Sequence, residues 1–172
     1  DSKSCKDSVG TFTIKPYDPP KTPGVSNNKK YCSGDALEKI TATGSGGTYT
    51  WYDDADLNNE LHVGPDYLPT NTVTDTIYVT ETEHGCTSDV DTVVIVINPL
   101  PGAEAGDLKH LTCRLPEVEL AGSATATGTG PLSYSWAPSG GIVSGGNTLK
   151  PLVNADGNFT LTVKDDSTGC IK

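Results

Sequence analysis

The residues Tyr49-Thr50-Trp51-Tyr52 and Leu132-Ser133-Tyr134-Ser135-Trp136 decide the fold of this chain. In both stretches large side chains alternate with small or polar ones. A period of two residues is typical of a β-strand with one buried face, because successive side chains point to opposite faces of a sheet. Each stretch also carries a tryptophan, Trp51 or Trp136, which indicates that the same strand occurs twice.

Further strands are predicted on both sides of each tryptophan. Short runs precede it at residues 38–42 and 117–121, and alternating runs follow it at 75–82 and 158–164. Residues 91–98 are nearly continuous Val and Ile, which predicts a strand that is buried on both faces or that closes a module. Turn-forming glycines separate these runs, and no apolar stripe of helical period exceeds about two turns. The sequence predicts an all-β fold.

The cysteines repeat in step with the tryptophans. Cys5, Cys86 and Cys170 follow one another at nearly equal intervals, and the step from Cys32 to Cys113 matches the step from Cys5 to Cys86. Proline-rich stretches at 15–24 and 98–101 cannot continue a strand ladder and indicate module boundaries. We therefore expect residues 1–21 to be the closing strand and exit linker of a preceding module. Residues 22–98 should form one complete module, and 99–172 a module that lacks its last strand.

A module without its last strand would expose backbone hydrogen-bonding groups. Two arrangements would resolve this: the sequence is a window on a longer array, or the first strand of one copy completes the last module of another and so builds a filament.

The cysteines favour disulfide bonds over zinc ligation, because they are far apart in the sequence and His62, His84 and His110 are isolated. Counting within each module pairs Cys32 with Cys86 and Cys113 with Cys170, and leaves Cys5 for a partner upstream. An oxidising compartment follows from this. The net charge of −10 argues against nucleic acid as a partner, and no apolar run is long enough for a membrane span.

The ordered set of motifs resembles a known family. Cys32-Ser33-Gly34, Tyr49-Thr50-Trp51-Tyr52-Asp53 and Gly85-Cys86-Thr87-Ser88 are similar to the immunoglobulin-like repeats of Bacteroidetes cell-surface adhesins. Ser133-Tyr134-Ser135-Trp136 and the run from Gly157 to Val163 resemble their PKD-like repeats. The resemblance implies tandem immunoglobulin-like antiparallel β-sandwiches joined by short Pro-rich linkers. It also implies long surface proteins exported by type IX secretion, gliding-motility adhesins among them.

Two kinds of site are candidates. Asp53, Asp54 and Asp56 lie in the densest stretch of oxygen ligands, so Ca²⁺ is a candidate there, and the alternative is a solvated polar turn with no cofactor. The chain also contains Asp followed by Ser or Thr and then by an apolar residue or Thr. This pattern resembles the O-glycosylation acceptor of secreted Bacteroidetes proteins. Such a motif places glycans on Ser8, Thr76, Thr92 and Ser167, although Asp-Thr is also common where strands begin.

No nucleophile, paired histidine or phosphate-binding motif indicates catalysis. We expect a non-catalytic, structural and adhesive region of an extracellular bacterial surface protein or filament. Its partners would be neighbouring modules of the same array, other copies of the chain, or surface glycans. The alternatives are carbohydrate-binding or spacer modules of a secreted hydrolase, and a filament subunit that polymerises by strand exchange.

Overall fold

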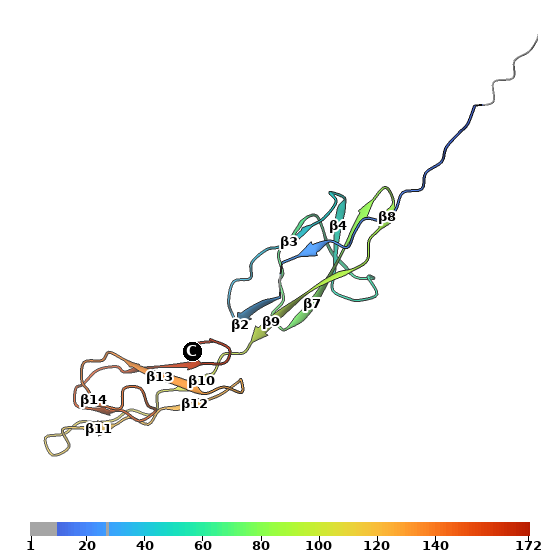
Figure 1. Cartoon of the computed structure of the whole chain (residues 1–172). Coiled ribbons are helices and arrows are strands. Elements are labelled where there is room, and N and C mark those ends of the chain that lie inside the picture. Colours follow the sequence, from blue (N-terminus) through green and yellow to red (C-terminus); the bar gives the residue numbers. More distant parts are fainter. Residues whose placement is uncertain (1–9, 27) are drawn as a thin grey trace, which may run out of the picture.

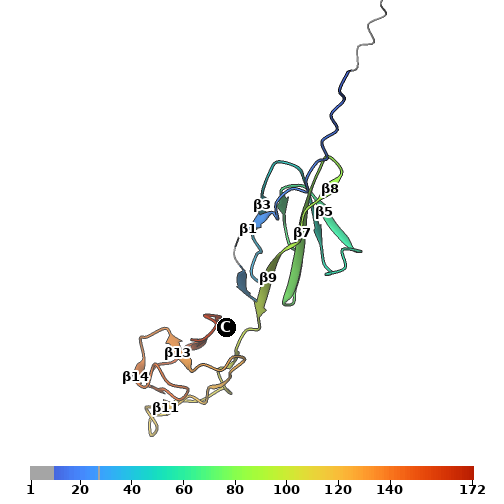
Figure 2. The same ribbon diagram turned by 45° about the vertical axis from the view of Figure 1, so that its right-hand side comes forward.

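The computed structural model describes residues 10–26 and 28–172, which form strands and turns without a helix (Figure 1). The strands gather into two modules, which we call the first module (β1 to β9) and the second module (β10 to β16). In both views the two modules lie end to end, with the second continuing beyond the end of β9 (Figures 1 and 2). The predicted all-β fold of tandem sandwiches is confirmed.

The first module is a sandwich of a large and a small sheet. The large sheet has the order β2-β9-β7-β4-β5, with β8 paired to β7, and the small sheet has the order β1-β3-β6. The strands of the large sheet are β2 (Lys29–Cys32), β4 (Thr48–Tyr52), β5 (Glu60–Val63), β7 (Asp75–Glu83), β8 (Cys86–Thr87) and β9 (Asp91–Asn98). The strands of the small sheet are β1 (Gly24–Val25), β3 (Ile40–Thr43) and β6 (Asp66–Tyr67).

The core of the first module forms where the inner faces of these sheets meet. Trp51 is fully buried at its centre, and the predicted alternation holds, because Tyr49 is also buried while Thr50 and Tyr52 are only partly so. The Trp51 indole Nε1–H donates to the carbonyl oxygen of Gly64 at 2.8 Å, which satisfies the polar atom of an otherwise apolar side chain. The other buried apolar residues of this core are Ile40, Ala42, Tyr67, Ile77, Val79, Val93 and Ile95.

The strand β9 is an interior strand of the large sheet of the first module. It lies between β7, to which it is antiparallel, and β2, to which it is parallel. Val93 and Ile95 on its core face are fully buried. Val94 and Val96 on the other face are half-buried.

The second module repeats this plan with fewer residues in ladders. Its sheets have the orders β13-β16, β10-β12 and β11-β15-β14. Trp136, Leu161 and Val163 form its buried core, and the Trp136 Nε1–H donates to the Thr148 carbonyl oxygen at 2.9 Å, as Trp51 does to Gly64. The strands are β10 (Gly102–Glu104), β11 (Val118–Glu119), β12 (Ser123–Thr125), β13 (Leu132–Ala137), β14 (Ile142–Ser144), β15 (Leu152–Val153) and β16 (Thr160–Asp165).

Residues 10–23 form no strand within this chain. The earlier part of this segment leads away from the first module on the side opposite the second module (Figures 1 and 2). Phe12, Ile14 and Tyr17 are 88%, 80% and 64% exposed. Within the described part of the chain, residues 10–21 pair with no strand, and residues 1–9 of the expected closing strand lie outside the described range, so that strand stays a prediction.

Candidate functional site

The junction between the two modules contains a disulfide bond. Cys32 of the first module is bonded to Cys170 of the second, with the two Cα atoms 5.6 Å apart and a sequence separation of 138 residues. The junction therefore has two covalent connections, the bond and the polypeptide that runs from Asn98 into β10.

The parallel pairing of β2 and β9 places Cys32 at this end of the first module. Cys32 lies opposite Asn98, the last residue of β9. The Ser33 N–H donates to the Asn98 carbonyl oxygen at 2.8 Å, and the Cys32 N–H donates to the Asp35 carboxylate at 2.8 Å. The cysteine is thus held beside the point where the chain leaves the module.

The second module presents Cys170 from the turn that follows β16. Gly169 in that turn has a φ of 80°, a conformation that favours glycine, and its N–H donates to the Asp165 carbonyl oxygen at 2.7 Å. The Cys170 sulfur then lies 4.0 Å from the Asn98 carbonyl oxygen. Thr127 of the second module donates its hydroxyl to the Pro99 carbonyl oxygen at 3.1 Å. Both covalent connections therefore lie close together.

The expected pairings of Cys32 with Cys86 and of Cys113 with Cys170 are wrong. Cys32, the last residue of β2, lies beside the last residue of β9, whereas Cys86 precedes the start of that eight-residue strand. A strand of that length spans roughly 25 Å, and a disulfide requires Cα atoms within about 7 Å. The cysteines recur at the same interval in the sequence whether they bond within a module or between modules. Counting cysteines therefore could not distinguish the two pairings.

Among the described residues, Cys86 and Cys113 are free thiols. Cys86 is half-buried, and its sulfur donates weakly to the Tyr17 carbonyl oxygen at 3.6 Å. Cys113 is exposed on a turn in which Thr112 and Leu115 pair with each other. Cys5 lies outside the described residues, so its predicted upstream partner stays a prediction.

The acidic stretch after β4 folds into a turn that uses its own carboxylates. Asp54 accepts the N–H groups of Asn58 and Asn59 at 3.0 and 2.7 Å, and Asp53 accepts the Asn59 side-chain amide at 2.6 Å. The backbone hydrogen bond from Asn58 lowers the pKa of Asp54. Asp56 is exposed. No group of three or more His, Cys, Asp or Glu side chains within residues 10–26 and 28–172 has a metal-binding arrangement.

The candidate glycosylation residues differ in accessibility. Thr92 is exposed, while Thr76 is half-buried, and in both motifs the preceding aspartate accepts the threonine N–H at 2.8 Å. Ser167 is exposed but its hydroxyl donates to the Asp165 carboxylate. Ser8 lies outside the described residues.

Two buried carboxylates were not anticipated from the sequence. Glu81 on β7 and Asp165 on β16 are both fully buried. Glu81 accepts the N–H groups of Ser45 and Gly47 at 3.0 and 2.7 Å. These hydrogen bonds hold the loop before β4 against β7, the strand that carries Glu81. The hydrogen bond from the Ser167 hydroxyl, together with backbone hydrogen bonds, lowers the pKa of Asp165. The sequence feature that could have indicated these contacts is the glycines in the facing loops, Gly44 and Gly47 beside Glu81 and Gly128 beside Asp165.

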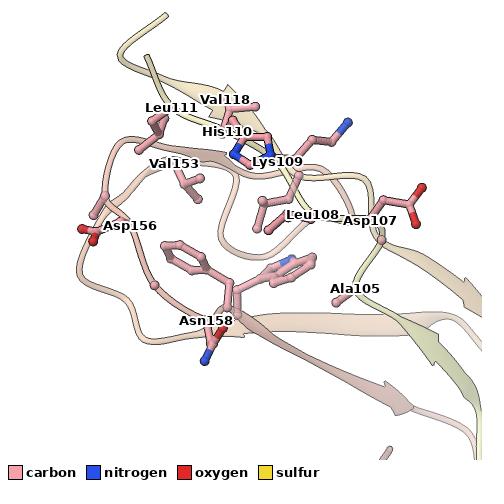
Figure 3. A pocket seen from close by; sticks show the side chains of 16 residues that line it. Ala105, Asp107, Leu108, Lys109, His110, Leu111, Val118, Val153, Asp156 and Asn158 are labelled. Atoms are coloured by element: carbon pink, nitrogen blue, oxygen red, sulfur yellow. The ribbon is translucent and has the colours of Figure 1, made fainter. Parts of the chain in front are cut away.

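The second module contains a cavity of about 510 Å³ between the loop that follows β10, the strands β11 and β15, and the loop that precedes β16 (Figure 3). Leu108 and Val153 point toward its interior, whereas the charged ends of Asp107, Lys109 and Asp156 point away from it (Figure 3). The cavity is thus an open hollow beside Trp136 with a mixed polar and apolar lining, and the labelled charged side chains do not converge on it.

No helix in the described part of the chain has the length and apolar character that crossing a bilayer requires. No curated protein matches the chain.

Similar solved structures consist of tandem immunoglobulin domains. A structure of DIP-gamma IG1+IG2 has 12% identity and a TM-score of 0.41, and the match covers 88% of this chain and 93% of that one. The I-band fragment I67–I69 of titin has 10% identity and a TM-score of 0.40, covering 90% and 61%. The Ig1-2 module of the Drosophila receptor protein tyrosine phosphatase DLAR has 8% identity and a TM-score of 0.32, covering 88% and 94%.

The family comparison concerns the first module. Residues 20–99 match the family described as "Ig-like domain CHU_C associated". This range contains every strand from β1 to β9, together with Cys32, Trp51 and Cys86. The first module is therefore similar to this family over its whole length, which is 80 of the 172 residues of the chain.

Proposed function

We propose that this chain is a structural and adhesive section of a long extracellular repeat protein, in which disulfide-linked immunoglobulin-like modules form a stiff stalk on a bacterial surface. The observation that carries the proposal is the bond between Cys32 and Cys170. A bond inside one module would stabilise only that module. A bond across the junction instead restricts how one module rotates against the next.

The local geometry supports this stiffening role. The bond and the peptide connection leave the first module from adjacent strands, since Cys32 lies opposite Asn98. Two neighbouring connections oppose twisting about the long axis, which a single flexible linker permits. The linker contains Pro99 and Pro101, and Pro101 is buried, so the polypeptide connection is itself restricted.

The chemistry of the described residues fits a non-catalytic, extracellular role. An immunoglobulin-like domain of this type and a disulfide bond are both consistent with an oxidising, extracellular environment. The buried carboxylates and the acidic turn are engaged in hydrogen bonds that hold loops. We propose that the acidic turn works without a metal ion and that the surface carries O-linked glycans, with exposed Thr92 as the main acceptor.

Three measurements on the natural protein test the proposal. An antibody raised against this chain should label intact, unpermeabilised cells of the producing bacterium, and negative-stain images of the released protein should show long rods. Labelling that requires permeabilisation, or compact particles, would refute the stalk. The intact mass should exceed that of the bare polypeptide by sugar residues, and a Thr92→Ala variant should lose part of this excess.

Strand exchange is a second candidate, favoured by the exposure of Phe12 and Ile14. Residues 10–17 correspond to β9 when Cys5 is aligned with Cys86, and β16 pairs with β13 on one side. A copy of residues 10–17 could add to the side of β16 that faces away from β13 in another molecule, where among the described residues only 170–172 form backbone hydrogen bonds, to Val163 and Asp165. Sedimentation of the isolated chain distinguishes the candidates: exchange predicts concentration-dependent polymers that an F12D/I14D variant does not form.

A further inference from the structure

The two free thiols lie at opposite ends of the pair of modules. Cys86 begins β8, at the end of the first module from which residues 10–23 emerge (Figures 1 and 2). Cys113 lies in the segment between β10 and β11, which reaches past β11 at the end of the second module furthest from the first (Figure 1). They cannot pair with each other within one copy.

The surroundings of Cys86 repeat those of the bonded Cys170. Each cysteine directly follows a turn glycine, and Gly85 and Gly169 have φ values of 78° and 80°. Each sulfur also lies near a carbonyl oxygen of the segment that leads into its module. For Cys170 this is Asn98, at 4.0 Å, and for Cys86 it is Tyr17, at 3.6 Å. Tyr17 precedes Asn98 by the same interval that separates Cys32 from Cys113, so the two carbonyl groups occupy equivalent places in the repeat.

This correspondence locates the missing partner of Cys86. In the first module Cys32 is the parallel neighbour of Asn98, and so it reaches Cys170. In a preceding repeat the corresponding cysteine would be the parallel neighbour of Tyr17. Tyr17 is held in position by stacking on His84, with the ring centres 4.0 Å apart and the rings 4° from parallel. That cysteine would therefore lie beside Cys86.

Cys113 has the place in the repeat that Cys32 has in the first module, and a tight turn occurs at both. One turn begins at Cys32, where the Asp35 N–H donates to the Cys32 carbonyl oxygen at 3.0 Å, and the pairing of Thr112 with Leu115 closes the turn that contains Cys113. Residues 110–113 correspond to β2, which in the first module pairs with the closing strand β9. In the second module the described residues provide no strand for 110–113 to pair with, and Cys113 is exposed.

We propose that Cys86 and Cys113 are bonded to neighbouring repeats, so that the β2-type cysteine of each repeat is joined to the post-turn cysteine of the repeat that follows. The inference rests on the proposed repeat array and specifies how its junctions are linked. It stands on the bond observed between the two corresponding positions, Cys32 and Cys170. When the bond forms, the two thiols lose two protons and two electrons. A disulfide of the oxidising compartment accepts them and leaves as two thiols.

Two copies of the full chain joined in register test the proposal. Cys170 of the first copy is followed directly by Lys6 of the second, because Cys170 and Cys5 begin corresponding segments, and Cys5 of the first copy is replaced by serine. The protein is folded in a glutathione buffer, free thiols are alkylated, and peptides are mapped by mass spectrometry without reduction. We expect both Cys32–Cys170 bonds and a third bond from Cys113 of the first copy to Cys86 of the second.

Matched variants and a shape measurement make the outcome decisive. C86S in the second copy should leave Cys113 of the first copy fully alkylated, whereas C86S in the first copy should leave the third bond unchanged. Both Cys32–Cys170 bonds serve as the marker of correct folding. If they form while the junction thiols are alkylated, the proposal is overturned. Small-angle scattering then tests the proposed stalk separately from the proposed disulfide between repeats. A rod of four modules with free junction thiols would support the stalk and contradict only the disulfide.

Discussion

Glu81 on β7 and Asp165 on β16 perform the same task in the two modules. Each carboxylate is fully buried and accepts a backbone N–H from the loop that precedes the tryptophan strand, at Gly47 and at Gly128. In both loops a glycine lies so close to the carboxylate that a Cβ atom would collide with it, at Gly44 and again at Gly128. Both modules therefore contain a buried carboxylate bonded to the loop before the tryptophan strand, although it is a glutamate in one and an aspartate in the other.

Replacement of Glu81 by alanine should destabilise the first module. The change leaves the N–H groups of Ser45 and Gly47 without their acceptor in a partly buried loop, which costs about 2 kcal/mol or more of the free energy of unfolding. Hydrogen exchange followed by mass spectrometry should show faster exchange across β4 and β7 with no change in the second module. Glu83→Ala, on the same strand but partly exposed, is the control and should stay within about 0.5 kcal/mol of the parent. Equal losses in both variants would contradict the assignment.

The second module should lose stability in acid through Asp165. Its pKa in the folded chain is lowered, chiefly by the hydrogen bond from Ser167, so folding favours the ionised form. This contribution is complete above the unfolded pKa of about 3.9 and is lost as the pH falls toward the lower folded pKa. Urea unfolding between pH 2 and 6 should show this dependence, and Asp165→Asn should flatten it.

Ser167→Ala separates hydrogen bonding from other causes of that shift. Removing the hydroxyl should move the Asp165 pKa back toward its usual value, which carboxyl-carbon NMR titration measures directly. Ser144→Ala, at an exposed site on β14, is the control and should leave the titration unchanged. An unchanged midpoint in the Ser167 variant would refute the hydroxyl as the main cause.

Each tryptophan should be needed for its own module only. Phenylalanine at position 51 or 136 removes the indole N–H that donates to Gly64 or Thr148 and leaves a gap in the core. We expect a loss of about 2–3 kcal/mol in the module concerned. Tyr52→Phe, on the outer face of β4, should cost less than about 0.5 kcal/mol. Module-resolved hydrogen exchange is the measurement, and a loss spread evenly over both modules would contradict independent cores.

Removal of the junction disulfide should loosen the pair of modules without unfolding either core. In the chain-entropy picture, a bond that closes a loop of well over about 100 residues contributes at most about 5 kcal/mol against complete unfolding. In Cys32→Ser, scattering curves should show a broader distribution of interatomic distances, while hydrogen exchange in β7 and β16 stays protected. Cys113→Ser should match the parent in both measurements. Unchanged scattering from Cys32→Ser would mean that the linker alone sets the geometry.

The sequence was a good guide to the strands and a poor guide to their connections. The alternation around Trp51 and Trp136 predicts the strands because side-chain period depends only on local geometry. The partner of Cys32 depends on something that period does not encode, the parallel pairing of β2 with β9, which brings Cys32 to the outgoing end of the module. In a repeat array, cysteines one period apart have the same sequence surroundings, whether they bond within their own module or to a neighbouring one.

The buried carboxylates illustrate a second limit. Glu81 lies in an alternating strand at an inward-facing position, where an apolar residue would be expected. The backbone groups that it binds come within reach only when the loop at residues 44–47 folds back over the strand. By contrast, the acidic stretch after β4 could be interpreted locally as a polar turn, because Asp54 bonds to the nearby Asn58 and Asn59.

The bond between Cys32 and Cys170 also changes how the chain would respond to being pulled from its two ends. Tension would pass through the two bonded sulfur atoms. The polypeptide between Cys32 and Cys170, a sequence separation of 138 residues, would therefore carry no load even if both cores unfolded. Roughly 450–500 Å of contour length would remain locked away. Only a reductant would release it, so the redox state of the surroundings would set how far a stretched stalk can lengthen.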